Sequence, residues 1–396
     1  MAEPYNTPIP GSTPRAGSPV SHPLPLRHPH LSSHSITTAP TSSPSSAPKP
    51  RRVLHLGDPI RFNPSTHDLL SSQYEVLRPS TDERQRGPFI QALKDGKWGE
   101  FEAIFRPFWQ TGGEMGDWNE ELITLLPKSV KVFASAGAGF DWVDTKMLGA
   151  RGIIYCNGGT SPAEAVADFS IAMIISTFRY IPWCINAATS NSPSAFSDCH
   201  LNSPSQCHNL RNHVLGIIGF GNIGQRIATR CYLGFGMKIH YFDVERKADS
   251  VEASVKATFH DSLESLLETA DCAILCTPAS FGGATTINAS TLGHFRHGGR
   301  FVNIARGALV NEDDLVEALK SGKLSAVALD VYANEPHVHE GLRRFAAEGR
   351  AMLTCHNAGG TWETHSGFEE LCMRNVMAVL GGGEALSAVN LGHLKK

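Results

Sequence analysis

The chain has 396 residues, 41% of them hydrophobic and 18% charged, with a formal net charge of −3. At about 100–200 residues per domain, this length predicts two or three domains with substantial hydrophobic cores. The near-neutral charge argues against nucleic-acid binding and against attachment to anionic membranes, and no run of about 18 apolar residues is present to predict a membrane span.

The chain contains nine cysteines, and no two of them form a Cys-X-X-Cys pair. An odd number without such pairs disfavours both a disulfide framework and a structural zinc site. We therefore expect reduced, mostly buried cysteines, no bound metal and a cytoplasmic location.

Residues 1–50 differ in composition from the rest of the chain, because they hold 12 of the 24 prolines, ten serines and one acidic residue, Glu3. Proline lacks the backbone donor that a helix needs, and few apolar side chains are available to form a core. The segment is predicted to be a disordered tail. Its prolines argue against the amphipathic helix of an organelle transit peptide, and it lacks the apolar segment of a secretory signal.

Ordered structure is expected from residue 51, where a basic pair precedes a short apolar strand. Residues 53–158 alternate short strands with helical patterns. Ser161 as N-cap and Pro162 in the first turn then predict a long helix that ends near residue 180.

Residues 186–212 are polar, with several Ser, Asn and Pro, which favours a surface loop. After this segment, strand and helix patterns alternate to about residue 360. Such alternation predicts a parallel sheet that is covered by helices.

A glycine-rich turn lies within residues 214–224, where an apolar strand leads into Gly-Phe-Gly-Asn-Ile-Gly and then a helix. This context, followed by a second strand that ends in an acidic residue, is the complete fingerprint of a dinucleotide-binding site. Gly219 permits the tight turn, Gly221 lets backbone N–H groups approach a pyrophosphate, and Gly224 allows the helix to pack closely on the strand.

Asp243 ends that second strand, 19 residues after Gly224. A carboxylate at this position accepts hydrogen bonds from ribose hydroxyls and repels a 2′-phosphate. NAD is therefore favoured over NADP, although Arg246 and Lys247 follow shortly afterwards and make the preference less strict.

Three later apolar stretches are each followed by a side chain that can carry a charge: Arg306, Glu335 and His356. Ligands of an open parallel sheet bind outside the carboxyl ends of its strands, so we expect these side chains at one site. Taken singly, they are also compatible with structural roles, as a helix cap, a solvated acid and a core histidine respectively.

Together these three residues suit the reduction of a carbonyl group. The reaction leaves an alkoxide that needs a proton, which His356 can supply near neutral pH. A carboxylate such as Glu335 fixes the tautomer of the imidazole and stabilises its protonated form. The guanidinium of Arg306 can bind a substrate carboxylate, and a nicotinamide would carry the hydride.

These motifs, in this order and at this spacing, resemble the NAD-dependent D-2-hydroxyacid dehydrogenases over residues 53–390. The resemblance rests on the glycine-rich turn, residues 302–307, residues 329–336 and the loop around His356. It implies an oxidoreductase that interconverts a 2-oxo acid and a D-2-hydroxy acid with NAD(H).

The resemblance also implies roles for individual residues. His356 is the general acid and base, Glu335 is its partner, and Arg306 anchors the substrate. The backbone at Ala138 and Gly139 holds the substrate carboxylate. The implied cofactor contacts are Gly219, Gly221, Asn222, Ile223, Gly224, Asp243, Thr277, Pro278, Ile304, Ala305, Asp330 (near the nicotinamide amide) and Gly359.

The implied architecture is α/β, with a Rossmann-type doubly wound parallel sheet and a second, discontinuous flavodoxin-like substrate domain. The substrate domain would span residues 53–160 and be completed by residues 363–396, and the NAD-binding domain would span residues 161–362. The active site would lie between the two domains. Members of the family are usually homodimers.

The substrate is less well defined than the chemistry. Cys355 and residues 357–361 depart from the usual family pattern and look most like a fungal branch with D-mandelate dehydrogenase-like and glyoxylate reductase-like members. Glyoxylate, hydroxypyruvate and phenylglyoxylate are therefore candidate substrates. Phe105, Phe108 and Trp109 either line an apolar substrate pocket or belong to the core of the smaller domain.

A binding protein is the main alternative from a different class. NAD(H)-sensing proteins that resemble the C-terminal-binding corepressors keep the same Arg, Glu and His residues, and a Pro/Ser-rich tail is compatible with an interaction role. Formate dehydrogenase is a second enzymatic alternative, which would need a smaller pocket with a different lining. Turnover of 2-oxo acids separates the leading prediction from both.

Overall fold

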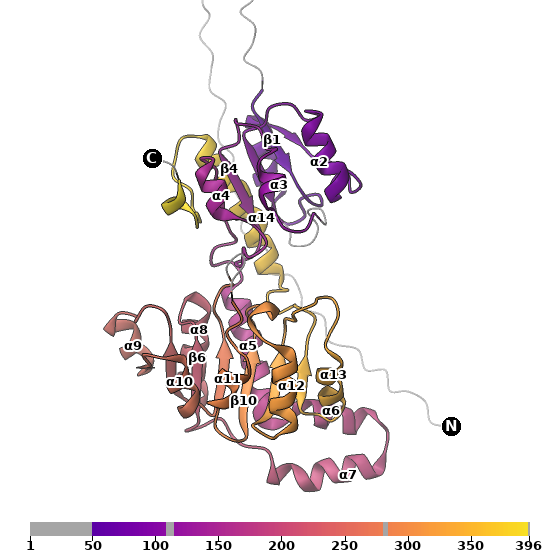
Figure 1. Cartoon of the computed structure of the whole chain (residues 1–396), viewed down its shortest axis with the longest axis vertical. Coiled ribbons are helices and arrows are strands. Elements are labelled where there is room, and N and C mark those ends of the chain that lie inside the picture. The colour runs from indigo at the N-terminus through magenta and orange to yellow at the C-terminus, as the bar shows by residue number, and fades with distance from the viewer. Residues whose placement is uncertain (1–49, 108–114, 280–283, 395–396) are drawn as a thin grey trace, which may run out of the picture. The chain divides into compact units, whose positions relative to one another are not determined.

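The computed structural model describes residues 50–107, 115–279 and 284–394 (Figure 1). They form two parallel sheets, one of five strands and one of seven. The predicted α/β fold is confirmed. Almost all of the predicted tail lies outside the described residues, as do Phe108 and Trp109 of the expected substrate pocket.

The five-stranded sheet has the order β2-β1-β3-β4-β5. Its strands are β1 (Arg52–His55), β2 (Glu75–Leu77), β3 (Ala103–Arg106), β4 (Val132–Ser135) and β5 (Ile154–Cys156), and the helices between them are α1 (Pro64–Gln73), α2 (Arg86–Lys94), α3 (Glu120–Ile123) and α4 (Thr145–Ala150). Successive side chains of a strand point to opposite faces, so the central strands β1, β3 and β4 bury residues on both sides. Phe105, for example, is fully buried and packs in the core under α1, while its neighbour Ile104 packs under α2.

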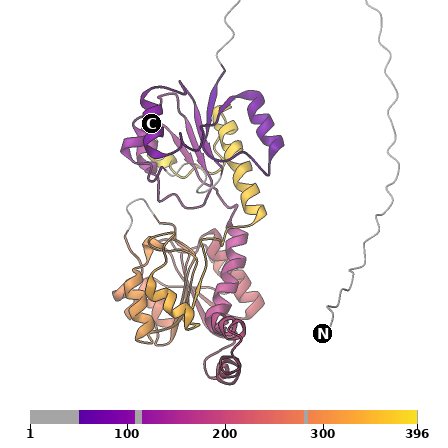
Figure 2. The same ribbon diagram turned by 90° about the vertical axis from the view of Figure 1, so that its right-hand side faces the viewer.

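The long helix α14 (Trp362–Leu380) returns from the C-terminal part of the chain to cover this sheet. Its buried side chains Cys372, Met373 and Val376 share one core with strands β1, β3 and β4. Figure 2 shows the yellow helix against the strands. The C-terminal helix therefore packs on the first sheet of the chain. The domain boundaries given above stay a prediction.

The seven-stranded sheet has the order β12-β11-β10-β9-β6-β7-β8. Its strands are β6 (Val214–Ile218), β7 (Lys238–Phe242), β8 (Thr258–Phe259), β9 (Cys272–Leu275), β10 (Gly299–Asn303), β11 (Leu324–Leu329) and β12 (Ala351–Leu353). Its helices are α5 (Ala163–Arg179), α8 (Asn222–Phe235), α9 (Asp249–Val255), α10 (Leu263–Thr269), α11 (Ala289–Gly293), α12 (Glu312–Lys320) and α13 (Glu340–Ala347). Strand numbers fall from β12 to β6 along the sheet and then rise to β8, so the chain crosses to the other half of the sheet at β6, as in a doubly wound sheet.

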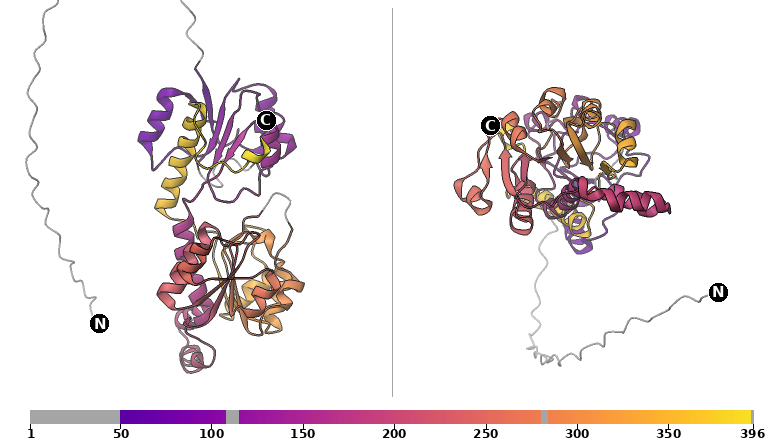
Figure 3. Two further views of the ribbon diagram at one scale, coloured as in Figure 1. Left: turned by 90° about the vertical axis from the view of Figure 1, so that its left-hand side faces the viewer. Right: turned by 90° about the horizontal axis from the view of Figure 1, so that it is seen from below.

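Alternation along the central strands explains why helices cover both faces of this sheet. In β9, Cys272 and Ile274 belong to the core under α5 and α8, while Ala273 and Leu275 belong to the core under α10 to α13. All four are fully buried. The left view of Figure 3 shows the two helix layers on either side of the strands.

The prediction of a surface loop over residues 186–212 is wrong. The helices α6 (Ile181–Thr189) and α7 (Pro193–Asn202) occupy most of it, and they extend from the sheet in Figures 1 and 3. The residues that looked like loop formers mark helix ends: the Ser192 side chain accepts a hydrogen bond from the Ala195 amide, and Pro193 opens α7. Both are preferred at a helix start.

The predicted N-cap of α5 is also wrong by one residue. The helix begins at Ala163, and Pro162 is its N-cap. The Ala163 amide donates to the Thr160 carbonyl oxygen at 3.0 Å, which closes a separate turn that contains Ser161.

No single helix within the described residues is long and apolar enough to cross a membrane. The helices α5 and α6 reach that length and hydropathy only together, and they are bent by 76° where they meet.

Close packing of α8 on β6 depends on Gly224, where a Cβ atom would collide with the carbonyl oxygen of Gly219. That oxygen belongs to the backbone and cannot move aside easily. We therefore expect Gly224→Ala to lower the free energy of unfolding by about 1–3 kcal/mol, the usual range for overpacking. Thermal unfolding measures the change.

Gly234 is a matched control in the same helix, because a Cβ atom there meets nothing within 4 Å. Alanine in an exposed helix is favoured over glycine by about 0.5–1 kcal/mol, so Gly234→Ala should leave the melting temperature unchanged or raise it. Equal losses in both variants would contradict the packing role of Gly224.

Candidate active site

The predicted site residues lie where the strands of the seven-stranded sheet end. Parallel strands bring their carboxyl ends to one edge, which is where such sheets bind ligands. The residues that follow the strands at this edge are Gly219 after β6, Asp243 after β7, Thr277 after β9, Arg306 after β10, Asp330 after β11 and His356 after β12.

The glycine-rich turn is built to receive an anion. Gly219 has a φ of +95°, and a Cβ atom there would lie 2.8 Å from the Thr277 side chain, so the two turns adjoin. Gly221 is the N-cap of α8 without a side-chain cap, and a Cβ atom on it would meet nothing within 4 Å. Within the described residues no group accepts a hydrogen bond from the amides of residues 221–223. Exposed amides at a helix N-terminus suit a pyrophosphate.

Asp243 joins the end of β7 to this turn. Its Oδ2 atom accepts a hydrogen bond from the Phe220 amide at 2.7 Å and lies 3.2 Å from Lys247 Nζ. Arg246 instead pairs with Glu252, at 2.8 Å. Arg246 is therefore bound to Glu252, and Lys247 is paired with Asp243.

Glu335 and His356 form a hydrogen-bonded pair, with 2.9 Å between Glu335 Oε2 and His356 Nδ1. The other oxygen, Oε1, accepts from the Tyr332 amide at 2.9 Å. Burial would raise the pKa of Glu335, but the bonds from His356 and Tyr332 and the charge of Arg306 outweigh it and hold that pKa below its usual range. Glu335 is therefore ionised at neutral pH.

The pair also links stability to pH. Folding lowers the pKa of Glu335, so its contribution to stability is present above the unfolded-state pKa of about 4.3. The contribution is lost as the pH falls through the lower pKa of the folded state. The same pairing keeps the imidazole oriented wherever Glu335 is ionised.

Asp330 holds the loop that carries His356. Its carboxylate is buried, with 1% exposure, and accepts from Thr354 Oγ1 at 2.7 Å and from the amides of Asn357 and Ala358 at 2.9 Å. The Asp330 carbonyl oxygen accepts from the His356 amide at 2.8 Å. These bonds flank a His356 backbone with a φ of +52°, a conformation that a non-glycine residue adopts only when its surroundings hold it there.

Arg306 meets the loop that follows β4. Its Nε atom donates to Asp141 Oδ1 at 2.9 Å, and its Nη1 atom donates to the Ala305 carbonyl oxygen at 2.8 Å. A Cβ atom at Gly139 would collide with Nη2 of the same guanidinium. The Ala138 carbonyl oxygen accepts from Asn157 Nδ2 at 2.8 Å. The structure thus brings Arg306 and Gly139, both predicted to bind the substrate carboxylate, into direct contact.

The remaining predicted residues have mainly packing contacts. Ile304 and Ala305 are buried in the two cores of the seven-stranded sheet, and Gly359 faces Pro162 and Val166 at the start of α5. Pro278 follows Thr277 beside the glycine-rich turn. Contacts of these residues with the cofactor stay predictions, as does the expected contact of Asp330 with the nicotinamide amide.

Sequence reasoning missed four partners in the site. Asp141 pairs with Arg306, the Tyr332 amide binds Glu335, Thr354 binds Asp330, and Asn157 binds the Ala138 loop. Asp141 carried a signal, because it is an acid directly after the glycine-containing loop. The other three act through a backbone amide, a hydroxyl and a side-chain amide, which leave no pattern in a single sequence.

The geometry fits a nicotinamide dinucleotide and an anionic carbonyl substrate. It combines a phosphate-binding turn, a carboxylate at the ribose position and an imidazole that is paired for proton transfer. The Arg306 guanidinium lies beside the backbone of Gly139.

Comparison with known proteins agrees with this chemistry. The family described as D-isomer specific 2-hydroxyacid dehydrogenase, NAD binding domain, matches residues 171–358. The 4-methyl-2-oxopentanoate reductase A of Aspergillus oryzae is 31% identical over 307 residues, which cover 77% of this chain and 88% of that protein. The chain belongs to the D-isomer specific 2-hydroxyacid dehydrogenase family. It is an oxidoreductase that acts on CH–OH groups, as the sequence predicted.

Solved structures of similar proteins match most of the chain. The holo form of D-mandelate dehydrogenase from Rhodotorula graminis superimposes with a TM-score of 0.82 at 36% identity, covering 86% of this chain and 98% of that one. A glyoxylate reductase from Paecilomyes thermophila gives a TM-score of 0.76 at 30% identity with the same coverage. These matches are to dehydrogenases and reductases, which favours the enzyme over the alternative of an NAD(H)-sensing binding protein.

Replacing Asp330 by Asn tests whether this carboxylate holds the His356 loop. The change removes the charge and turns one acceptor oxygen into a donor that faces other donors. Hydrogen bonds to charged groups are worth about 1.5–3 kcal/mol, so we expect the free energy of unfolding to fall by about 2–4 kcal/mol. Denaturant unfolding measures the loss, with the exposed Glu317→Gln as control. Unchanged stability in Asp330→Asn would contradict the role.

Proposed function

We propose that this dehydrogenase reduces a small 2-oxo acid to the D-2-hydroxy acid with NADH, and that His356 supplies the proton. The observation that carries the proposal is the 2.9 Å hydrogen bond between His356 Nδ1 and Glu335 Oε2. It leads us to assign Nε2 as the atom that exchanges a proton with the substrate oxygen. The paired, ionised Glu335 stabilises the imidazolium before transfer.

Other residues bind the cofactor and position the substrate in this proposal. The amides of residues 221–223 would hold the pyrophosphate, and when bound the reduced nicotinamide supplies the hydride. Arg306 binds the substrate carboxylate through charge-assisted hydrogen bonds, together with the backbone at Gly139. Asp141 acts on Arg306, because their bond fixes the plane of the guanidinium. A fixed carboxylate orients the carbonyl carbon for attack.

The names of similar proteins support the substrate class. They include a D-mandelate dehydrogenase, a glyoxylate reductase and a 4-methyl-2-oxopentanoate reductase, all of which act on 2-oxo or 2-hydroxy acids. We propose glyoxylate, hydroxypyruvate and phenylglyoxylate as the first substrates to examine. The predicted division into a substrate domain and an NAD-binding domain fits this reaction.

The function is tested by steady-state assays of those three acids and a branched-chain 2-oxo acid with NADH. At least one acid should be reduced, and His356→Gln should lower its turnover by about 10²–10⁴-fold while NADH still binds. His294→Gln, which changes an imidazole on the protein surface, is the control. Turnover of none of the acids, or an unchanged rate in His356→Gln, would contradict the proposal.

The role of Glu335 predicts a change in the pH profile. Glu335→Gln keeps the shape of the side chain and removes the negative charge that favours imidazolium. The rate of reduction should therefore begin its alkaline fall about one pH unit lower than in the unchanged enzyme. The profile of kcat/KM measures this. A lower rate with an unmoved profile would assign Glu335 a purely structural role.

We propose NAD as the preferred cofactor, on the support of Asp243. Its carboxylate lies against the Phe220 amide of the glycine-rich turn, where a 2′-phosphate would be repelled. Asp243→Asn should reduce the ratio of kcat/KM for NADH to that for NADPH by about tenfold, or 1.4 kcal/mol. The exposed Asp261→Asn is the control. An unchanged ratio would remove the basis for the preference.

We also propose that the enzyme is cytoplasmic, as its free cysteines suggest.

We further propose that the enzyme is a homodimer. Support for the dimer comes from α6 and α7, which expose four large apolar side chains: Ile181, Ile185, Phe196 and Leu201. Large apolar side chains exposed together on two adjoining helices are a candidate interaction site. Light scattering should give twice the chain mass of 42.8 kDa, and a monomer mass at micromolar concentration would contradict the dimer.

A further inference from the structure

A cavity of about 150 Å³ opens at the edge of the seven-stranded sheet opposite the cofactor turn. It lies where strands begin: His213 precedes β6, Asp271 precedes β9, and His297 and Arg300 lie at the start of β10. These three strands are neighbours at the centre of the sheet. None of the residues predicted to bind cofactor or substrate lines the cavity, so it is separate from the candidate active site.

Arg300 is the buried cation of this cavity, with 7% exposure. Its Nε atom donates to the Thr177 carbonyl oxygen at 3.2 Å, and its guanidinium lies 4.3 Å from the centroid of the Phe178 ring. These contacts cap the last turn of α5. A guanidinium has five N–H donors, and within the described residues nothing accepts from the four on Nη1 and Nη2.

Arg350 shows how this protein satisfies a comparable side chain. It precedes β12 at the same edge of the sheet and stacks on Phe345 at 4.9 Å. Its guanidinium, however, donates to three carbonyl oxygens, those of Leu319, Leu324 and Ser325, at 2.8–3.0 Å. Arg300 has one such partner, and its other donors face the cavity.

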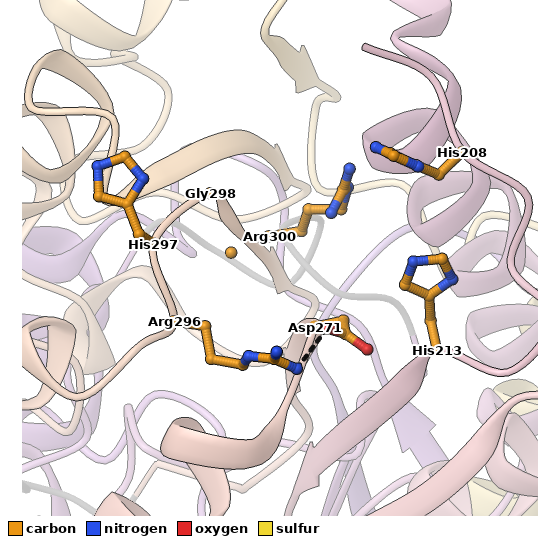
Figure 4. Close-up of a pocket in the computed structure, with 8 residues that line it drawn as sticks. His208, His213, Asp271, Arg296, His297, Gly298 and Arg300 are labelled. Carbon is orange, nitrogen blue, oxygen red and sulfur yellow. Dashed lines mark hydrogen bonds and ion pairs between the residues drawn. The ribbon is translucent and has the colours of Figure 1, made fainter. Parts of the chain in front are cut away.

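The single acid that lines the cavity does not neutralise Arg300. Asp271 accepts from the Val214 amide at 2.8 Å and from Arg296 Nη1 at 2.9 Å. Figure 4 shows Arg296 turned toward Asp271, while the side chains of Arg300 and His208 extend toward one another. One full positive charge therefore remains without a counter-ion among the described residues.

Histidines line the cavity beside Arg300. Burial and the charges of Arg300 and His213 lower the pKa of His208, so the His208 ring interacts electrostatically with the Arg300 guanidinium. The Nδ1 atom of His213 is buried and has no hydrogen-bond partner within the described residues. His297 lines the other side of the cavity. An acceptor-rich anion would supply what these donors lack, and it would favour protonation of the rings.

We propose that this cavity binds a small oxyanion of the phosphate type, held by Arg300 and His208. Such an anion offers several acceptor oxygens in a compact shape, which suits a guanidinium and imidazole N–H groups that line one cavity. Bound there, it would tie the end of α5 and the segment before β6 to the start of β10. A ligand of the folded state alone stabilises that state by mass action.

The test uses the full chain and inorganic phosphate at constant ionic strength. Isothermal titration should show saturable binding at one site that persists in saturating NADH, and the melting temperature should rise with phosphate. Both Arg300→Lys and the surface variant His208→Gln should weaken this binding at least tenfold. Arg350→Lys, which changes a half-buried stacked arginine with three donors already bound to carbonyl oxygens, should bind phosphate as the unchanged chain does.

Three results would overturn the proposal. The first is the absence of saturable binding. The second is binding that NADH abolishes, which would assign the phosphate to the glycine-rich turn. The third is unchanged affinity in His208→Gln and Arg300→Lys. Because none of these measurements involves turnover of a 2-oxo acid, their outcome is independent of the proposed reaction.

Discussion

The buried carboxylate of Asp330 is the constraint on which the site depends. It accepts three hydrogen bonds from residues 354–358, and its backbone accepts a fourth from His356. A loop held in this way can keep the His356 backbone in a left-handed conformation that is uncommon for a residue other than glycine. The position of the ring, and with it the bond to Glu335, follows from a group that itself takes no part in proton transfer.

Charge is arranged in separate pairs around this centre. Glu335 is bound to His356 and the Tyr332 amide, while Arg306 is bound to Asp141 and lies against Gly139. Each ionised group thus has a fixed partner before any ligand arrives, which limits the reorganisation that catalysis requires. Parallel strands make the arrangement possible, because they deliver residues distant in sequence to one edge.

The sequence alone predicted those parts of the site that have a local signal. The glycine-rich turn, Asp243 and the polar residues at strand ends could be found because strand periodicity fixes where each strand ends. Asp141 stood out as an acid after the glycine-containing loop, but its pairing with Arg306 could not be found, since the two are 165 residues apart and only the folded chain brings them together. The helices α6 and α7 were missed because their Ser and Pro residues signal loops as strongly as helix starts.

The central claim is that His356, oriented by Glu335, faces the carbonyl oxygen of a bound 2-oxo acid. A crystal structure of the enzyme with reduced dinucleotide and a substrate analogue such as oxamate tests it most directly. We expect His356 Nε2 within about 2.6–3.2 Å of the oxygen that stands for the substrate carbonyl, with Nδ1 still bound to Glu335. An imidazole turned away from the analogue, with the Glu335 bond broken, would contradict the account.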